Sequence, residues 1–192
     1  MLQRWSDFCR VMTLAGLIGA GSMLPALPPG MRFGNLQCRP PQGWRMAEQN
    51  GSLTFIAPDS SRGQEAAIVL APGRPFAGDF RAEFDKWVRL ISSRDMAPGY
   101  GEVQQHGGAG YDILTQAVVV GPDPAHRGIR LFVAANPGGR FELILAMASS
   151  ESLFRKYQAE FTKFLESVEY DEAPAAPVIE ATPPAVRPAA AA

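Results

Sequence analysis

The fold is decided by the stretch from Tyr111 to Tyr170, which reads YDILTQAVVVGPDPAHRGIRLFVAANPGGRFELILAMASSESLFRKYQAEFTKFLESVEY. Three of its segments are rich in apolar and β-branched residues and have the length of strands: 111–120, 129–135 and 141–147. Turn-forming sequences separate them, Gly-Pro-Asp-Pro after the first and Asn-Pro-Gly-Gly after the second. Links this short join antiparallel neighbours, because a parallel pair needs a long crossover. The stretch therefore predicts an antiparallel three-stranded meander followed by a helix.

Two amphipathic helices are predicted, one before the meander and one after it. Asp79 is placed to cap the first, since its carboxylate can accept backbone N–H bonds of the opening turn. The apolar stripe of this helix consists of Phe80, Phe84, Trp87, Val88 and Ile91. Ser149 or Ser150 caps the second helix, whose stripe consists of Leu153, Phe154, Tyr157, Phe161, Phe164, Leu165 and Val168. We interpret both stripes as core packing.

Two further strands, at 52–57 and 66–71, precede the first helix, and each ends at a proline turn. The strands 129–135 and 141–147 become apolar on both faces toward their second halves, so neither face is simply open to water. The pattern predicts an α+β fold, an α/β/α sandwich in which a central, mostly antiparallel sheet carries one long helix on each face. We place this domain at residues 38–170.

Composition excludes one class of function and leaves the cysteines uninformative. The net charge is −1, from 18 basic and 19 acidic side chains, and no run of like charges occurs. This balance supplies no general attraction to nucleic acid, so we predict no nucleic-acid partner. Of the two cysteines, Cys9 lies in the N-terminal segment. We predict no intramolecular disulfide, and we interpret Cys38 as a plain thiol.

Residues 1–30 are interpreted as a targeting segment. A weakly positive start precedes the apolar run 11–27, which is the order of a secretory signal peptide. An uncleaved membrane anchor is the main alternative, since a run of about 20 apolar residues spans a bilayer. In a third interpretation Met23 or Met31 is the true start and the protein is cytoplasmic.

Residues 171–192 differ sharply in composition from the domain. They consist almost entirely of Ala, Pro, Val and Glu, and they show no apolar periodicity. Such a segment buries too little apolar surface to offset the entropy of ordering. We predict a disordered Pro/Ala-rich tail that serves as a tether or a wrapping segment.

The order of elements, together with several short phrases, resembles the PsbP superfamily of small α/β/α domains, which includes bacterial DcrB-like proteins. The phrases are Pro-Gln-Gly-Trp at 41–44, Leu-Thr-Phe-Ile-Ala-Pro at 53–58, Ala-Ser-Ser-Glu at 148–151 and Phe-Leu-Glu-Ser-Val at 164–168. The resemblance covers roughly residues 38–170. It implies a mostly non-enzymatic domain, found in exported or lumenal subunits, lipoproteins and protein-binding adaptors. It implies no catalytic site that could be carried over.

Side chains with the potential for chemistry are few. His106-Gly107-Gly108 resembles the oxyanion loop of esterases, but the chain has no Gly-x-Ser-x-Gly nucleophile elbow. His126 with Asp123 offers too few ligands for a usual zinc site. Glu142 and Glu102 are interpreted as exposed strand ends rather than a glycosidase pair. We therefore predict no catalytic, cofactor-binding or metal-binding residues, no cofactor and no enzymatic activity.

Two hypotheses on function follow. The first is an exported, non-catalytic protein-interaction module, an accessory or assembly subunit of a complex in the cell envelope. In this hypothesis the protein is periplasmic, or membrane-anchored through residues 11–27 and facing the periplasm, and its partners are envelope proteins. The alternative is a small-ligand carrier with a cleft between the first helix and the sheet, its mouth formed by the loops at Tyr100 and Gly107.

Overall fold

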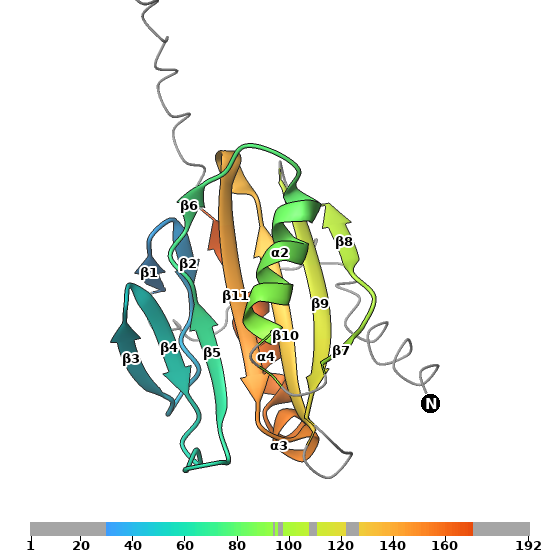
Figure 1. Ribbon diagram of the computed structural model, residues 1–192. Helices are drawn as coiled ribbons and strands as arrows, with labels where there is room; N and C mark the ends of the chain where they lie inside the picture. Colours follow the sequence, from blue (N-terminus) through green and yellow to red (C-terminus); the bar gives the residue numbers. More distant parts are fainter. Residues whose placement is uncertain (1–29, 94, 96–97, 108–110, 122–126, 171–192) are drawn as a thin grey trace, which may run out of the picture.

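The computed structural model describes residues 30–93, 95, 98–107, 111–121 and 127–170, and the structural statements below refer to these residues. Their main feature is a nine-stranded, wholly antiparallel sheet with the order β3-β4-β5-β11-β10-β9-β7, in which β6 also pairs with β11 and β8 with β9 (Figure 1). Its strands are β3 (Arg45–Gln49), β4 (Ser52–Ile56), β5 (Ala66–Leu70), β6 (Arg74–Pro75), β7 (Gly99–Tyr100), β8 (Gln104–Gly107), β9 (Asp112–Val120), β10 (Gly128–Ala135) and β11 (Arg140–Ala148).

The predicted meander is confirmed as the centre of this sheet. β9, β10 and β11 are neighbours in chain order, with Phe132 of β10 opposite Gln116 of β9 and Leu145 of β11. The link from β10 to β11 is a short 3₁₀ turn, η2 (Pro137–Gly139), in which Gly138 and Gly139 have φ of 55° and 74°. Glycine adopts this left-handed region without steric cost, so the Asn-Pro-Gly-Gly sequence makes the reversal tight.

The first predicted helix is confirmed as α2 (Phe80–Ser92). The Asp79 side chain accepts hydrogen bonds from the backbone N–H groups of Arg81 and Ala82, as an N-cap should. α2 lies across β9, β10 and β11 on one side of the sheet (Figure 1). Buried residues of α2 and these three strands form a core there: Phe84, Val88, Leu114, Val118, Val120, Phe132, Ala134, Phe141, Leu143 and Leu145.

The second predicted helix is broken into two, so the expectation of one long helix on each face is wrong for this side. α3 (Glu151–Lys156) and α4 (Gln158–Glu166) meet at Tyr157, whose φ of −102° and ψ of 10° are not helical. The Tyr157 ring is buried and meets the Trp44 ring edge-on, with centroids 5.3 Å apart. An apolar stripe specifies which side of a helix is buried but not whether the helix is continuous.

A three-stranded sheet, absent from the prediction, shares this side with α3 and α4. It consists of β1 (Met31–Phe33), β2 (Leu36–Cys38) and β12 (Glu169–Tyr170), with β2 in the middle. Leu36 and Cys38 are buried in the same core as Phe161 and Phe164. The predicted domain start at residue 38 therefore leaves out β1 and most of β2.

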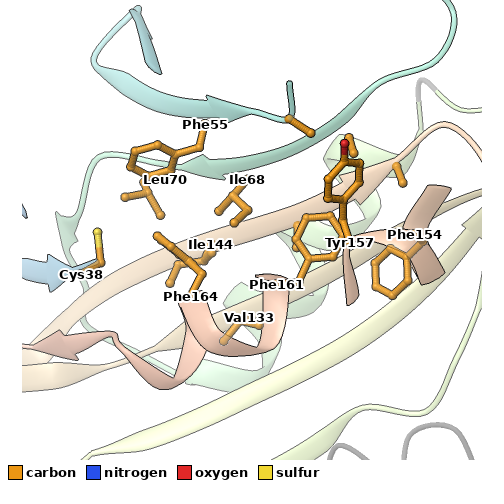
Figure 2. Packing of buried hydrophobic residues seen from close by; sticks show 14 of the residues in the cluster. Cys38, Phe55, Ile68, Leu70, Val133, Ile144, Phe154, Tyr157, Phe161 and Phe164 are labelled. Atoms are coloured by element: carbon orange, nitrogen blue, oxygen red, sulfur yellow. The ribbon is translucent and has the colours of Figure 1, made fainter. Parts of the chain in front are cut away.

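The core on the α4 side is built largely from aromatic rings against aliphatic strand residues (Figure 2). Phe154 and Phe161 have ring centroids 5.1 Å apart, and Phe55 of β4 lies 5.6 Å from Phe164. Rings at such separations contribute about 0.5–1.5 kcal/mol beyond their buried area. Among the described helices, none combines the length and hydropathy that crossing a bilayer requires.

Candidate interaction surface

α2 leaves one part of its side of the sheet uncovered. In the antiparallel register, Ala47, Thr54 and Val69 stand in one cross-strand row with Leu145, which belongs to the α2 core. Residues directly opposite each other across antiparallel strands point to the same side. These side chains therefore share the α2 side, yet α2 packs over the strands beyond them (Figure 1).

We define the open face as the α2-side residues of β3, β4 and β5 that remain exposed or half-buried, with Val69 at its edge against the α2 core: Arg45, Ala47, Gln49, Ser52, Thr54, Ile56 and Val69. Ile56 is half-buried but packs against neither core. β3 is exposed at all five positions and forms one edge of the sheet. A β-branched, half-exposed surface beside a free strand edge is the kind of surface that other proteins bind.

One flank of α2 borders the open face. Glu83, Trp87 and Leu90 recur at i, i+4 and i+7 and so share one side of the helix. The guanidinium carbon of Arg74 lies 4.5 Å from the centre of the Trp87 ring. Arg74 belongs to β6, and both β6 and β5 pair with β11. This flank therefore looks toward β5. Leu90, which is 51% exposed, is the apolar end of this border.

The border carries more positive than negative charge. Glu83 is bound by Arg74, by the Trp87 indole at 2.9 Å and by Lys86 at 3.5 Å. Burial opposes ionisation of this carboxyl, but the hydrogen bonds from Trp87 and Arg74 and the charges of Arg74 and Lys86 outweigh it, so its pKa is lowered. The Glu83 carboxylate thus pairs with two cations, Arg74 and Lys86, and Arg45 adds a third cation on the open face.

Beyond the C-terminal end of α2, an ion pair joins the chain to β10. Arg130 of β10 donates to Asp95 from two of its three guanidinium nitrogens, at 2.6 Å from Nε and 2.5 Å from Nη2. Tyr100, which we expected at the mouth of a cleft, lies on the edge strand β7 and is 46% exposed.

Glu142 is a buried residue, and its interpretation as an exposed strand end is wrong. It is 3% exposed and accepts a hydrogen bond from Arg140 Nε at 3.2 Å. Burial raises the pKa of its carboxyl, and the Arg140 charge only partly offsets that effect. Its carboxylate abuts Gly73, where a Cβ atom would overlap both oxygens. Glu102 is exposed in the link between β7 and β8, so the two glutamates do not meet.

The remaining sequence candidates form no chemical site within the described ranges. His106 sits in β8 opposite Ile113, whereas Asp123, His126 and residues 108–110 lie outside the described residues. Among described side chains, no group of three or more His, Cys, Asp and Glu could hold a metal. Burial raises the pKa of Cys38 to about 11, which leaves its thiol unreactive at neutral pH.

The interface between α2 and the sheet is filled by side chains in the part of the chain that the structure describes. Phe84, Val88 and Phe132 are each at most 1% exposed there. Side chains this fully buried indicate close packing of α2 on the sheet at these positions. Nothing in the described structure therefore favours the carrier hypothesis, and the open face is the better candidate for function.

Comparison with solved structures gives a match for this architecture. The solution structure of cyanobacterial PsbP (CyanoP) from Synechocystis sp. PCC 6803 aligns with a TM-score of 0.51, covering 81% of this chain and 99% of that chain. The chain has a PsbP-like fold. The resemblance inferred from the sequence is thereby confirmed at the level of fold. Identity with the cyanobacterial protein is 12%, so the match concerns the fold alone.

Comparisons of sequence give no match. No protein-family model matches the chain, and no curated protein does so. The function of this PsbP-like domain must therefore be argued from its own surface.

Proposed function

We propose that this PsbP-like chain is an exported, non-catalytic protein-interaction module, an accessory or assembly subunit of an envelope complex, and that it binds its partner through the open face. The observation that carries the proposal is the exposed face of β3–β5 beside Leu90. In the described part of the chain, α2 packs over β9, β10 and β11 and not over β3 and β4, so Ile56 stays half-buried outside both cores, while Val69 of β5 lies at the edge of the α2 core. A contiguous surface of this kind marks interaction sites more often than isolated exposed residues do.

Two further observations support the proposal. The Arg140–Glu142 ion pair has a structural role, because Arg140 also holds the linker before β6 through a 2.6 Å hydrogen bond to the Gly73 carbonyl. The Arg130–Asp95 pair likewise joins β10 to the segment that follows α2. The proposed location rests on the apolar run 11–27, which lies outside the described residues.

The test is a tagged pull-down from membrane and periplasmic fractions, with N-terminal sequencing of the recovered protein. Ala47→Arg places a bulky charge on the open face, and Met46→Arg places the same charge one residue away on the opposite side of the same strand. Both positions are exposed, so neither variant should unfold the protein.

We expect the natural chain and Met46→Arg to recover partners in similar amounts, and Ala47→Arg to recover at least tenfold less. An N-terminus between Met23 and Met31 supports cleavage. Equal recovery with Ala47→Arg contradicts the assigned surface. Recovery of a partner-free cytosolic monomer that starts at Met1 contradicts both export and docking.

A further inference from the structure

We propose that residues 171–192 of the same chain dock on the open face. The inference uses the open face described above but does not depend on the external partner. It rests on where the described chain ends, on the charge around the face and on the sequence of the segment.

The described chain ends on the α4 side of the sheet, where Tyr170 packs against the core of Phe161 and Phe164, and the linker before β6 separates it from the border of the open face. Tyr170, the last residue of β12, has its ring centroid 5.3 Å from that of Tyr111, and burial, together with the charges of Tyr111 and Glu142, raises the pKa of its phenol. Glu142 in turn abuts Gly73. The next residue, Arg74, stacks on Trp87 at the border of the open face. A chain leaving Tyr170 therefore needs only to pass the linker before β6 to reach the α2 side.

The length of the segment is sufficient. Extended, residues 171–192 reach about 70 Å, at about 3.3 Å per residue. The thirteen-residue helix α2, which runs alongside the open face, is only about 20 Å long. The segment can therefore turn around the end of the sheet and still follow the full length of the face.

Residues 171–192 and the open face are complementary in charge and in apolar character. The segment contains Asp171, Glu172 and Glu180 against one base, Arg187. At the border of the face, Arg74 and Lys86 share the single carboxylate of Glu83, and Arg45 lies on the face at its far edge. The apolar pair in the segment is Val178-Ile179, which precedes Glu180 directly. β-branched side chains of this kind pack well on a half-exposed pleated surface such as Thr54, Ile56 and Val69.

The energetics require only a weak contact. A tether of this length gives an effective concentration in the millimolar range, so a contact with millimolar affinity is already substantially occupied. The prolines of the segment restrict the free chain and lower the entropy lost on docking. A contact of this strength covers the open face in the isolated protein and is displaced by any partner that binds the face more tightly.

The experiment is site-specific photo-crosslinking of the full chain. Ile179→p-benzoylphenylalanine is irradiated at low protein concentration, and the products are mapped by peptide mass spectrometry. Ala191→p-benzoylphenylalanine, at the far end of the segment, is the matched control. We expect intramolecular crosslinks from position 179 to residues 54–56, Val69 and Leu90, at a yield several-fold above that of the control.

A charge variant tests the electrostatic part of the inference. Ala47→Glu on the open face should lower the crosslink yield several-fold by repelling Glu180, whereas Met46→Glu on the other side of β3 should not. Raising the salt to about 1 M should lower the yield as well. Crosslinks spread over the surface, located on the α4 side or formed only between copies would overturn the proposal.

Failure of this inference is distinguishable from failure of the proposed function. If Ala47→Arg loses the external partners but position 179 forms no crosslinks to the open face, only the self-docking proposal is contradicted. If crosslinks map to the open face but Ala47→Arg recovers partners as well as the natural chain does, only the proposed partner site is contradicted.

Discussion

Replacement of Gly73 by alanine should destabilise the domain severely for a reason that the local sequence does not show. Gly73 has no left-handed φ, so alanine is compatible with its backbone. The new Cβ atom, however, would overlap the Glu142 carboxylate, which must move by more than about 1 Å to restore van der Waals separation. That movement breaks the 3.2 Å hydrogen bond from Arg140 to a carboxylate that is 3% exposed.

The magnitude follows from the cost of disrupting a buried ion pair, which is about 3–5 kcal/mol when one partner is left uncompensated. Because Arg140 is partly exposed and keeps its bond to the Gly73 carbonyl, we take the lower end. Gly73→Ala should lower the free energy of unfolding by about 3 kcal/mol, which corresponds to about 10 °C in Tm for a domain of this size. Urea titration and thermal unfolding measure the two quantities.

A double-mutant comparison separates this overlap from a general sensitivity of the linker. Glu142→Ala removes the obstructing carboxylate, so the second change Gly73→Ala should cost less than about 1 kcal/mol in that background. Glu142→Gln keeps the volume but removes the charge, so the cost of Gly73→Ala should fall to that of displacing a buried neutral amide, about 1–2 kcal/mol. If Gly73→Ala costs the same in the natural chain and in Glu142→Ala, the steric reasoning is refuted.

Three further predictions concern single side chains. Burial raises the pKa of Glu142, so the folded state binds more protons than the unfolded state once pH exceeds the ordinary glutamate pKa of about 4.3, and the stability contributed by this group falls as pH rises from there. Glu142→Gln should therefore gain stability relative to the natural chain as pH rises above that point, measured by urea midpoints, and a constant difference would contradict the assignment. Asp79→Ala should lower the free energy of unfolding by about 1 kcal/mol, because the helix loses its N-cap. Asp85→Ala removes only an exposed ion pair with Arg81 and should lower it by less than about 0.5 kcal/mol, with both values measured by urea titration. Cys38, with a thiol pKa of about 11, should react slowly with iodoacetamide near pH 8 in the folded protein and readily in urea. The mass of its peptide reports the alkylation, and rapid alkylation without denaturant would show that Cys38 is not buried against the core.

The central meander and α2 were predictable from sequence because their signals are local. Alternating apolar residues with proline and glycine turns specify strands, and Asp79 before a helical stripe specifies a capped helix. β3 was missed although Asn50-Gly51, a strong hairpin signal, follows it directly; these residues have φ of 53° and 72°. Its sequence, RMAEQ, contains no β-branched residue, and the pairing with β4 rather than intrinsic propensity makes it a strand.

The candidate surface could not be predicted in the same way. The residues of the open face lie on three strands, and nothing in their sequences tells which part of the sheet α2 will cover. The sequence pattern places Leu90 outside the main stripe of α2, but only the contact of Arg74 with Trp87 shows that this flank looks toward β5. The buried state of Glu142 likewise depends on Gly73, which is 69 positions earlier in the chain.

The sequence by itself determined the α+β class, the antiparallel order at the centre of the sheet, the first helix with its cap and the PsbP-like resemblance. Tertiary structure alone decided the break at Tyr157, the small sheet of β1, β2 and β12, the burial of Glu142 and the position of the open face. The physical reason is the range of the interactions. Capping and turn geometry act within a few residues, whereas the burial of an aromatic ring or a carboxylate depends on elements that meet only after the chain has folded.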